Sequence, residues 1–231
     1  MSTKQTNPRI CIIYFSLSGQ SRGLINLLAA GIRSRGVEVV VEKIRTVEQI
    51  SFPFNSMLRT LKMMLTTFFR VRIPVLEPSR RCFEAFDLMI LAGPTWSYNP
   101  SGPVLSLLDR YGGKLFGSKT VIPLISCRGY HRMHEYLLKR QLQSCGAAPS
   151  PAIVFHHPVA EPWSTIGVFL KSAGYRPEKM SLLAGRYDHF GHTADQLIEA
   201  RAIGEKIADD LLQQPLKSEN STPLAQVQKS C

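Results

Sequence analysis

The sequence predicts a doubly wound α/β fold, with five parallel strands in the order 2-1-3-4-5 and helices on both faces of the sheet. Short apolar runs rich in Ile, Val and Leu alternate with segments whose apolar residues recur every three or four positions. Glycine or proline stands at several of the junctions. Strands that alternate with helices in this way form parallel sheets covered on both faces.

The elements follow in order along the chain. The expected strands are 10–15, 37–41, 88–92, 120–125 and 152–155. The expected helices are 20–35, 103–111, 131–145 and 193–212. Gly36 and Gly146 end two of these helices, as glycine commonly does, and Pro103 begins another.

The length, 231 residues with 44% hydrophobic content, suits one domain with a full core, which we expect over 1–214. Two segments exceed the minimal plan: an insert at 46–81, and a lid-like loop at 156–191 that is rich in proline, glycine and aromatic residues. The polar tail at 215–231 is expected to be disordered.

The insert contains an amphipathic helical pattern. Its broad apolar face comprises Met57, Leu58, Leu61, Met64, Leu65, Phe68 and Phe69. Between Asn55 and Arg81 six basic residues stand against one acid, Glu77. We expect the apolar face to pack on the sheet; the alternative is a basic amphipathic helix that contacts a membrane surface through 57–72.

Composition narrows the class of protein. No stretch approaches the roughly 20 apolar residues of a membrane span. Because Met1 to Arg9 are polar and run into a strand, no secretory signal is expected. Five cysteines without CxxC spacing indicate free thiols and a cytoplasmic protein. The net charge of +11 could attract nicotinamide phosphates, anionic lipid or nucleic acid. Specific nucleic-acid binding is not expected, and a homo-oligomer stays open.

The loop after the first strand carries polar chemistry suited to an anion: Ser16, Ser18, Gly19, Gln20 and Ser21. Because a helix follows directly, its N-terminal amides and dipole attract negative charge, so the loop predicts a phosphate site. Gly-Lys-Ser/Thr and G-x-G-x-x-G are absent here, which excludes the common triphosphate and dinucleotide loops. G-x-S-x-G is also absent.

Two further strand ends offer aromatic side chains. After 88–92 come Pro94, Thr95, Trp96, Ser97, Tyr98 and Asn99, and after 120–125 come Cys127, Arg128, Gly129 and Tyr130. Ligands of doubly wound sheets bind beyond the carboxyl ends of the strands. Trp96, Tyr98 and Tyr130 could stack on a flat ring whose polar edge meets backbone amides.

These loops resemble those of the flavodoxin-like superfamily over about residues 9–212. Ser16 to Ser21 match the flavodoxin phosphate loop S/T-x-S/T-G-x-S/T, and 93–103 is similar to the ring-binding loop of NAD(P)H:quinone and FMN reductases. The insert with Phe52-Pro53-Phe54 and the loop Ser126-Cys127-Arg128 look like the dialkylresorcinol-condensing-type branch. The resemblance implies FMN, with its phosphate on the first loop and its ring on Pro94 to Asn99 and Cys127 to Tyr130.

The function expected from this resemblance is NAD(P)H-dependent two-electron reduction of a quinone or similar small acceptor. Arg128 supports it, because a cation would favour negative charge on a reduced flavin, where electron-shuttling flavodoxins tend to carry acids. A non-catalytic binding or accessory module and a one-electron flavodoxin carrier are the alternatives. The histidines lack the companions of a recognisable metal motif, so no metal site is expected, and no catalytic residue is assigned.

Overall fold

The computed structural model describes residues 7–187 and 189–213, and it has one sheet in the order β2-β1-β3-β5-β6, with β4 on β3 and β7 on β5. The strands are β1 (Arg9–Tyr14), β2 (Glu38–Lys43), β3 (Leu88–Trp96), β4 (Asn99–Pro100), β5 (Thr120–Cys127), β6 (Ala148–Pro149) and β7 (Ile153–His156). All pairs except β3–β4 are parallel. Since β6 and β7 both pair with the outer edge of β5, the predicted order 2-1-3-4-5 is confirmed.

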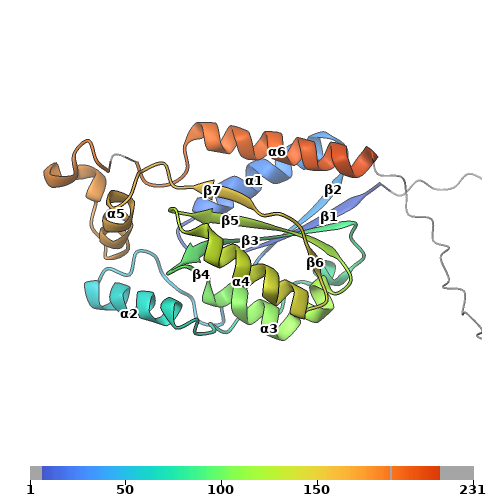
Figure 1. Cartoon of the computed structure of the whole chain (residues 1–231), viewed down its shortest axis with the longest axis horizontal. Coiled ribbons are helices and arrows are strands. Elements are labelled where there is room, and N and C mark those ends of the chain that lie inside the picture. The colour runs from blue at the N-terminus through green and yellow to red at the C-terminus, as the bar shows by residue number, and fades with distance from the viewer. Residues whose placement is uncertain (1–6, 188, 214–231) are drawn as a thin grey trace, which may run out of the picture.

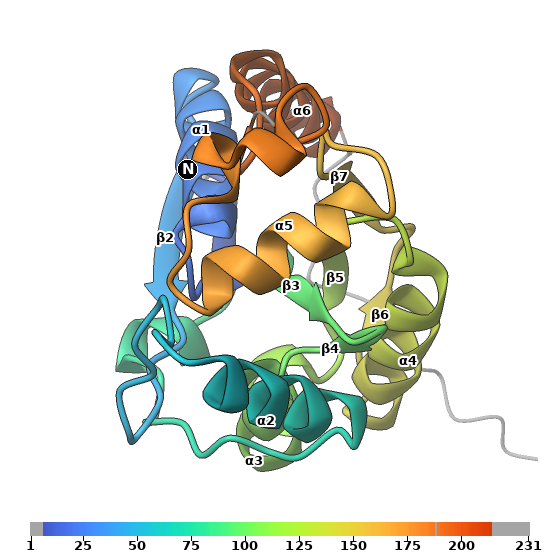
Figure 2. The same cartoon turned by 90° about the vertical axis from the view of Figure 1, so that its left-hand side faces the viewer.

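The helices form two layers on the sheet and a third group at its end. They are α1 (Gln20–Ser34), α2 (Met57–Phe68), α3 (Gly102–Phe116), α4 (His131–Ser144), α5 (Trp163–Ser172) and α6 (Ala194–Gln213). Helices α1 and α6 cover one face and α3 and α4 the other (Figure 1). Helices α2 and α5 lie across the end at which the strands finish (Figure 2).

Successive residues of a strand point to opposite faces of the sheet, so each strand contributes to two hydrophobic clusters. Along β1, Ile10 and Ile12 pack in the cluster formed with α1 and α6, whereas Cys11 and Ile13 pack in the cluster formed with α3 and α4. All four side chains are fully buried. Because parallel strands are covered on both faces, their sequences show continuous apolar runs, which is the pattern from which the fold was predicted.

Helices α1 and α6 cross at close range. A methyl group on Gly31 would lie 2.1 Å from the carbonyl oxygen of Arg201, and one on Gly204 would lie 2.2 Å from that of Leu28. The two glycines therefore allow the backbones to touch. This contact holds α6 against α1, the helix that begins at the predicted phosphate loop.

Two element boundaries differ from those predicted. Helix α3 continues to Phe116 past the expected end at Tyr111, because Gly112 packs against the Cys145 side chain, where a methyl group would lie 2.4 Å from the sulfur atom. Strand β3 continues past Ala92 to Trp96, since Gly93 and Pro94 keep their register with β5. The strand therefore carries part of the candidate site on regular backbone.

The segment 156–191, expected to be a loop, contains α5 and two 3-10 turns. Gly167 and β-branched residues weaken the helical signal of α5. Gly167 is required because the Tyr187 ring packs on it; a methyl group would lie 2.1 Å from that ring. The predicted domain range 1–214 stays a prediction, and the predicted disordered tail, 215–231, lies outside the described residues.

The prediction that the apolar face of α2 packs on the sheet is wrong. Only Thr60 and Thr67 of α2 are buried, whereas Leu58 is 76% and Phe68 57% exposed. The helix turns Thr67 inward because its hydroxyl and carbonyl groups bond to the hairpin β3–β4, and Thr60 lines the cleft, as described below. Among the described helices, none combines the length and the apolar character needed to cross a membrane.

Candidate functional site

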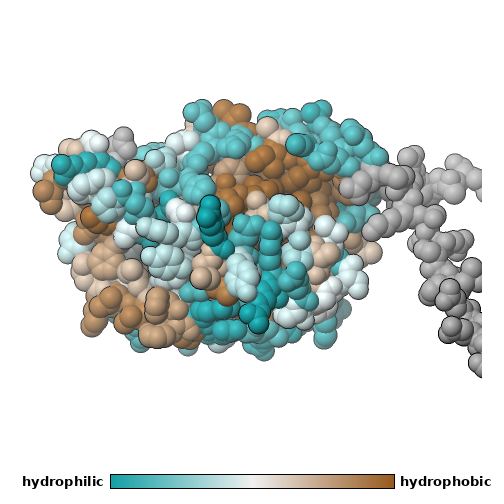
Figure 3. Space-filling view, viewed as in Figure 1, coloured by the Kyte–Doolittle hydropathy of each residue, from teal (hydrophilic) through white to brown (hydrophobic). Residues whose placement is uncertain are grey.

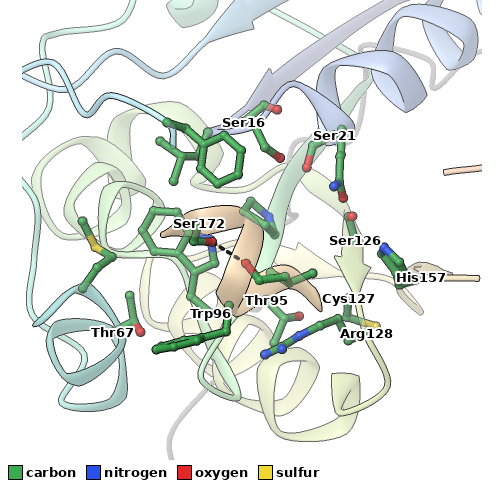
Figure 4. Close-up of a pocket in the computed structure, with 18 of the residues that line it drawn as sticks. Ser16, Ser21, Thr67, Thr95, Trp96, Ser126, Cys127, Arg128, His157 and Ser172 are labelled. Atoms are coloured by element: carbon green, nitrogen blue, oxygen red, sulfur yellow. Dashed lines mark hydrogen bonds between the residues drawn. The ribbon is translucent and has the colours of Figure 1, made fainter. Parts of the chain in front are cut away.

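A cleft with about 1050 Å³ of empty space, part of it open to solvent, lies at the carboxyl ends of β1, β3 and β5. Helices α2 and α5 and the aromatic side chains of Phe52, Phe54 and Phe190 enclose it on the outer side. Figure 4 shows Ser16 and Ser21 on one side of the cleft, with Trp96 and Arg128 across from them.

The loop after β1 forms a tight turn into α1. Gly19 is the N-cap residue with φ of +88°, a left-handed conformation that glycine adopts at low cost. Ser16 and Ser21 are buried, and Ser16 Oγ accepts a 3.4 Å hydrogen bond from the Arg22 backbone N–H. No acid stands in the first turn of α1, so no carboxylate there competes with a bound anion for the positive end of the helix dipole. The loop can therefore hold an anion.

The chain after β3 forms a β-hairpin with β4, and this hairpin is hydrogen-bonded to α2. Ser97 and Tyr98 form its turn, both with positive φ. The buried Asn99 side chain donates from Nδ2 to the Thr67, Phe68 and Ser97 carbonyl oxygens at 3.3, 3.4 and 2.9 Å. Ser97 Oγ also lies 2.8 Å from Thr67 Oγ1. These bonds fix the end of α2 and give the Asn99 Nδ2 group its partners within the protein.

Trp96 and Thr95 point into the cleft from the end of β3. The Trp96 ring packs edge-on against Phe15, with centroids 5.5 Å apart, which holds the indole in place. Thr95 Oγ1 lies 2.7 Å from Nδ1 of the buried His134. Burial lowers the pKa of His134 to about 3, so this histidine is neutral at physiological pH. The floor of the cleft is therefore rigid and carries no charge at this point.

A chain of hydrogen bonds links the end of β5, where the third predicted site loop begins, to α6. Gln196 Oε1 accepts from the Thr193 backbone N–H, at 3.1 Å, and lies 3.2 Å from His192 Nδ1. Nδ1 must therefore carry the proton, and His192 Nε2 accepts from the Ser126 hydroxyl at 2.8 Å. Burial lowers the pKa of His192, in agreement with a neutral ring. Ser126 and His192 both line the cleft.

His157 contributes an unpartnered donor to the cleft. Its Nδ1 accepts from the Val159 backbone N–H at 3.2 Å, so the proton of the neutral ring lies on Nε2. This buried Nε2 has no hydrogen-bond partner among the described residues. The ring stacks on Tyr187 with centroids 5.9 Å apart, and burial lowers the pKa of His157 to about 4. A buried N–H without a partner suits a ligand atom that accepts a hydrogen bond.

Arg128 brings a positive charge to the same cleft. It is half-buried, lines the cavity and forms no salt bridge within the described ranges 7–187 and 189–213. Burial and the neighbouring histidines lower the pKa of His157 first, and the charge of Arg128 adds to this effect. Against the effect of burial, hydrogen bonding from Thr165 is the main cause that lowers the pKa of Glu161, and Arg128 again contributes less. A ligand that becomes more negative in this cleft would be stabilised by Arg128.

The structure brings most of the sequence-predicted site residues to the cleft. Those that line it are Ser16, Ser18, Gln20, Ser21, Pro94, Thr95, Trp96, Ser97, Cys127 and Arg128. Gly19, Tyr98, Asn99, Gly129 and Tyr130 do not line it. Tyr98 and Tyr130 are exposed and pack edge to face on each other, 5.0 Å between centroids, instead of offering two separate faces to a ring.

Other lining residues were not predicted as site residues from the sequence, although Met64 was placed on the apolar face of the insert. They come from the insert, from α5 and from the segments around it: Thr60, Met63, Met64, Thr67, His157, Val168, Phe169, Ser172, Phe190 and His192. Pro and aromatic enrichment in 156–191 did indicate a cover. The sequence did not indicate the individual lining residues of α5, because the helix itself was not predicted.

One cluster could offer ligands to a metal ion. Cys127, His131 and His156 place their ligand atoms within 4.8 Å of one another, and His131 Nδ1 lies 3.1 Å from His156 Nε2. Sequence spacing could not show this group, because His156 comes from a different strand. Burial raises the pKa of the Cys127 thiol to about 11, which opposes the thiolate form that binds metal.

Comparison with known proteins supports the fold. No protein-family model matches the chain, and no curated protein matches it. A flavoprotein from Lactobacillus acidophilus, solved in complex with FMN, is similar with a TM-score of 0.51 and 15% identity, over 64% of this chain and 93% of that chain. A candidate flavoprotein from Bacteroides eggerthii is similar with a TM-score of 0.50 and 16% identity, over 74% of this chain and 100% of that chain.

These observations define the fold of the protein. The strand order, the position of the cleft and these similarities show that the chain has the flavodoxin-like fold indicated by its three loops. At 15–16% identity the likeness defines the architecture alone.

Proposed function

We propose that this protein binds FMN in the cleft and catalyses two-electron reduction of a quinone or similar small acceptor with electrons from NAD(P)H. The observation that carries the proposal is the meeting of three features in one cleft: an acid-free helix N-terminus with buried serines, the fixed Trp96 ring and the unpartnered Nε2–H of His157. The flavoprotein from Lactobacillus acidophilus, which has this fold, was solved with FMN.

The residues present fit the cofactor. Ser16, Ser18 and Ser21 would hold the phosphate together with the backbone amides at the start of α1. Trp96 and the apolar side chains of the cover would contact the ring, and His157 Nε2–H would donate to one of its acceptor atoms. When bound, FMN supplies the redox chemistry itself, so few protein side chains need to be catalytic.

The side chains around the cleft would position the cofactor, place a positive charge beside it and exclude water. The aromatic rings of Phe52 and Phe190, which line the cleft on its outer side, stack with centroids 6.1 Å apart and shield that part of it from solvent. Arg128 favours the more negative, reduced state of a bound ring. The neutral histidines 134, 157 and 192 add no competing charge at physiological pH.

The first test is binding. The protein is purified without added cofactor, its visible spectrum is recorded, and the apo-protein is titrated with FMN and with riboflavin. We expect submicromolar binding of FMN and at least about tenfold weaker binding of riboflavin, which lacks the phosphate, since each 1.4 kcal/mol of lost contact is a factor of ten. Equal binding of both flavins would reject the phosphate site. A protein that binds neither would reject the FMN proposal and favour the non-catalytic binding module.

The second test concerns the reaction. The loaded protein is mixed with NADH or NADPH under anaerobic conditions, and flavin bleaching is followed before a soluble quinone is added. Bleaching by a nicotinamide and rapid reoxidation by the quinone are expected. A flavin that is bleached only by a one-electron donor protein would favour the carrier alternative.

A further inference from the structure

The outer face of α2 forms an exposed apolar surface, here called the α2 surface and made of Met57, Leu58, Leu61, Leu65, Phe68 and Phe69. Leu58 and Phe69 are 76% and 71% exposed, and each of the other four is 44% exposed or more. Figure 3 shows this surface as a brown area at the lower left, over α2. Contiguous exposed apolar surface of this kind marks an interaction site.

Specific hydrogen bonds keep this face outward. The opposite side of α2 is buried through Thr60 and Thr67. Thr67 Oγ1 lies 2.8 Å from Ser97 Oγ, and Asn99 Nδ2 donates to the Thr67 and Phe68 carbonyl oxygens. Rotation of the helix to bury Leu61 or Phe68 would break these bonds. The exposure is therefore a stable property of the fold.

Basic residues border the α2 surface. Arg59 and Lys62 are exposed on α2 itself and form no salt bridge with any described residue. Arg70 and Arg72 follow directly, and of these Arg72 pairs with Asp109 at 2.6 Å. The helix has no acidic residue, and the whole chain carries a net charge of +11. This charge complements an anionic surface.

We propose that α2 docks the protein onto an anionic lipid bilayer. The helix would lie along the membrane, with its apolar residues in the boundary between headgroups and acyl chains and with Arg59 and Lys62 at lipid phosphates. Apolar area and adjoining positive charge on one short, well-formed helix favour a lipid surface over an acidic protein, which would need no such continuous apolar face. The docking does not depend on the cofactor.

Helix α2 separates the α2 surface from the cleft, so docking through this helix would bring a membrane close to the candidate site. Met63, on the inner side of the same helix, and Met64, at the margin of its exposed face, line the cleft. A membrane bound to the α2 surface would therefore adjoin the cover of the candidate site. If the proposed function holds, an acceptor dissolved in the bilayer could enter without crossing bulk water.

The test is flotation with vesicles of phosphatidylcholine, with and without phosphatidylglycerol, using protein with and without FMN. The apolar variant is Leu61→Ser with Phe68→Ser, and its matched control is Ile198→Ser with Leu212→Ser, two exposed residues of α6. The charge variant is Arg59→Glu with Lys62→Glu, matched by Arg132→Glu with Arg140→Glu on α4. Leu58→Ser provides a milder apolar change if the double variant unfolds, as judged by near-UV circular dichroism.

The expected result is that the wild type floats with phosphatidylglycerol vesicles at least tenfold more than with phosphatidylcholine alone. Both α2 variants should lose at least tenfold of this partitioning, while both control variants keep it. Failure of the wild type to float at low salt, or equal loss in variants and controls, would overturn the proposal. A dimer in sedimentation equilibrium that is lost in the apolar variant would assign the surface to a second copy of the chain and also overturn it. Flotation without FMN binding would leave the docking intact and reject only the proposed function.

Discussion

Ser126 Oγ, at the end of β5, lies 2.8 Å from His192 Nε2, just before α6 begins. The bond closes one side of the cleft and joins the sheet to the C-terminal helix. Ser126 is 8% exposed, so its hydroxyl needs this partner unless a ligand provides another. The orientation of His192 is set in turn by Gln196, which also donates from Nε2 to the His156 carbonyl oxygen at 2.7 Å.

A double-mutant cycle tests this bond. Ser126→Ala and His192→Leu should each lower the free energy of unfolding by about 1–3 kcal/mol, because each leaves a buried polar atom unpaired. The double variant should cost less than the sum by about 1 kcal/mol, as expected for groups in direct contact. Urea denaturation measures all four proteins. Strictly additive losses would show that the two side chains do not interact in solution.

Stability should fall in acid because two buried histidines must take up protons on unfolding. The pKa values of His134 and His157 are lowered by burial from 6.5 to about 3 and about 4. The unfolded chain then binds more protons below pH 6.5, so this stability is present at neutral pH and is lost as the pH falls towards the folded values. At pH 5 each histidine accounts for a loss of about 2 kcal/mol, at 1.36 kcal/mol per pH unit.

The measurement is urea denaturation between pH 7.5 and 5, an interval chosen to lie above both lowered values. His134→Gln and His157→Gln should each make the dependence on pH shallower, and the double variant should make it shallower still. An unchanged slope in both single variants would contradict the burial of neutral imidazoles at these positions.

The close crossing of α1 and α6 predicts a specific glycine requirement. Gly31→Ala would place a methyl group 2.1 Å from the Arg201 carbonyl oxygen, so the helices must separate. Overpacking of this kind costs about 1–3 kcal/mol. Gly113→Ala in α3 is the matched control, because nothing lies within 4 Å of its added methyl group. Thermal unfolding should show a lower Tm for the first variant and an unchanged or higher Tm for the second, since alanine is the better helix former. A Tm for Gly31→Ala equal to that of the wild type would disprove the close contact.

The sequence predicted the sheet because its strands are buried on both faces and read as continuous apolar runs, as in β1 and β5. It predicted the strand ends of the site because the residue types there, serines around Gly19 and the ring of Trp96, suit a particular ligand. It could not predict which way α2 faces. Amphipathicity defines two sides of a helix but not their surroundings, and the deciding partners, Ser97 and Asn99, stand about 30 residues further along. The α5 cover was hidden for a similar reason, since Gly167 opposes a helix locally and is explained only by the distant Tyr187 ring.

Arg128 provides a test of the charge at the candidate flavin site. Arg128→Gln keeps a long polar side chain but removes the positive charge that favours a reduced, more negative ring. An opposite charge near the surface contributes on the order of 1 kcal/mol at 4 Å in water. For a two-electron couple this corresponds to a midpoint potential about 20 mV more negative in the variant. Anaerobic titration of the FMN-loaded protein against a reference dye measures the shift.

Arg132→Gln, an exposed arginine of α4 that does not line the cleft, is the matched control and should leave the potential unchanged. The shift in Arg128→Gln should shrink at high salt if solvent ions reach the site, and persist if the cover of α2 and α5 keeps them out. A potential that is the same in Arg128→Gln and in the wild type at low salt would show that Arg128 does not act on the ring. The two-electron chemistry that we propose would then have to depend on the cover and on a hydrogen bond from His157 to the ring.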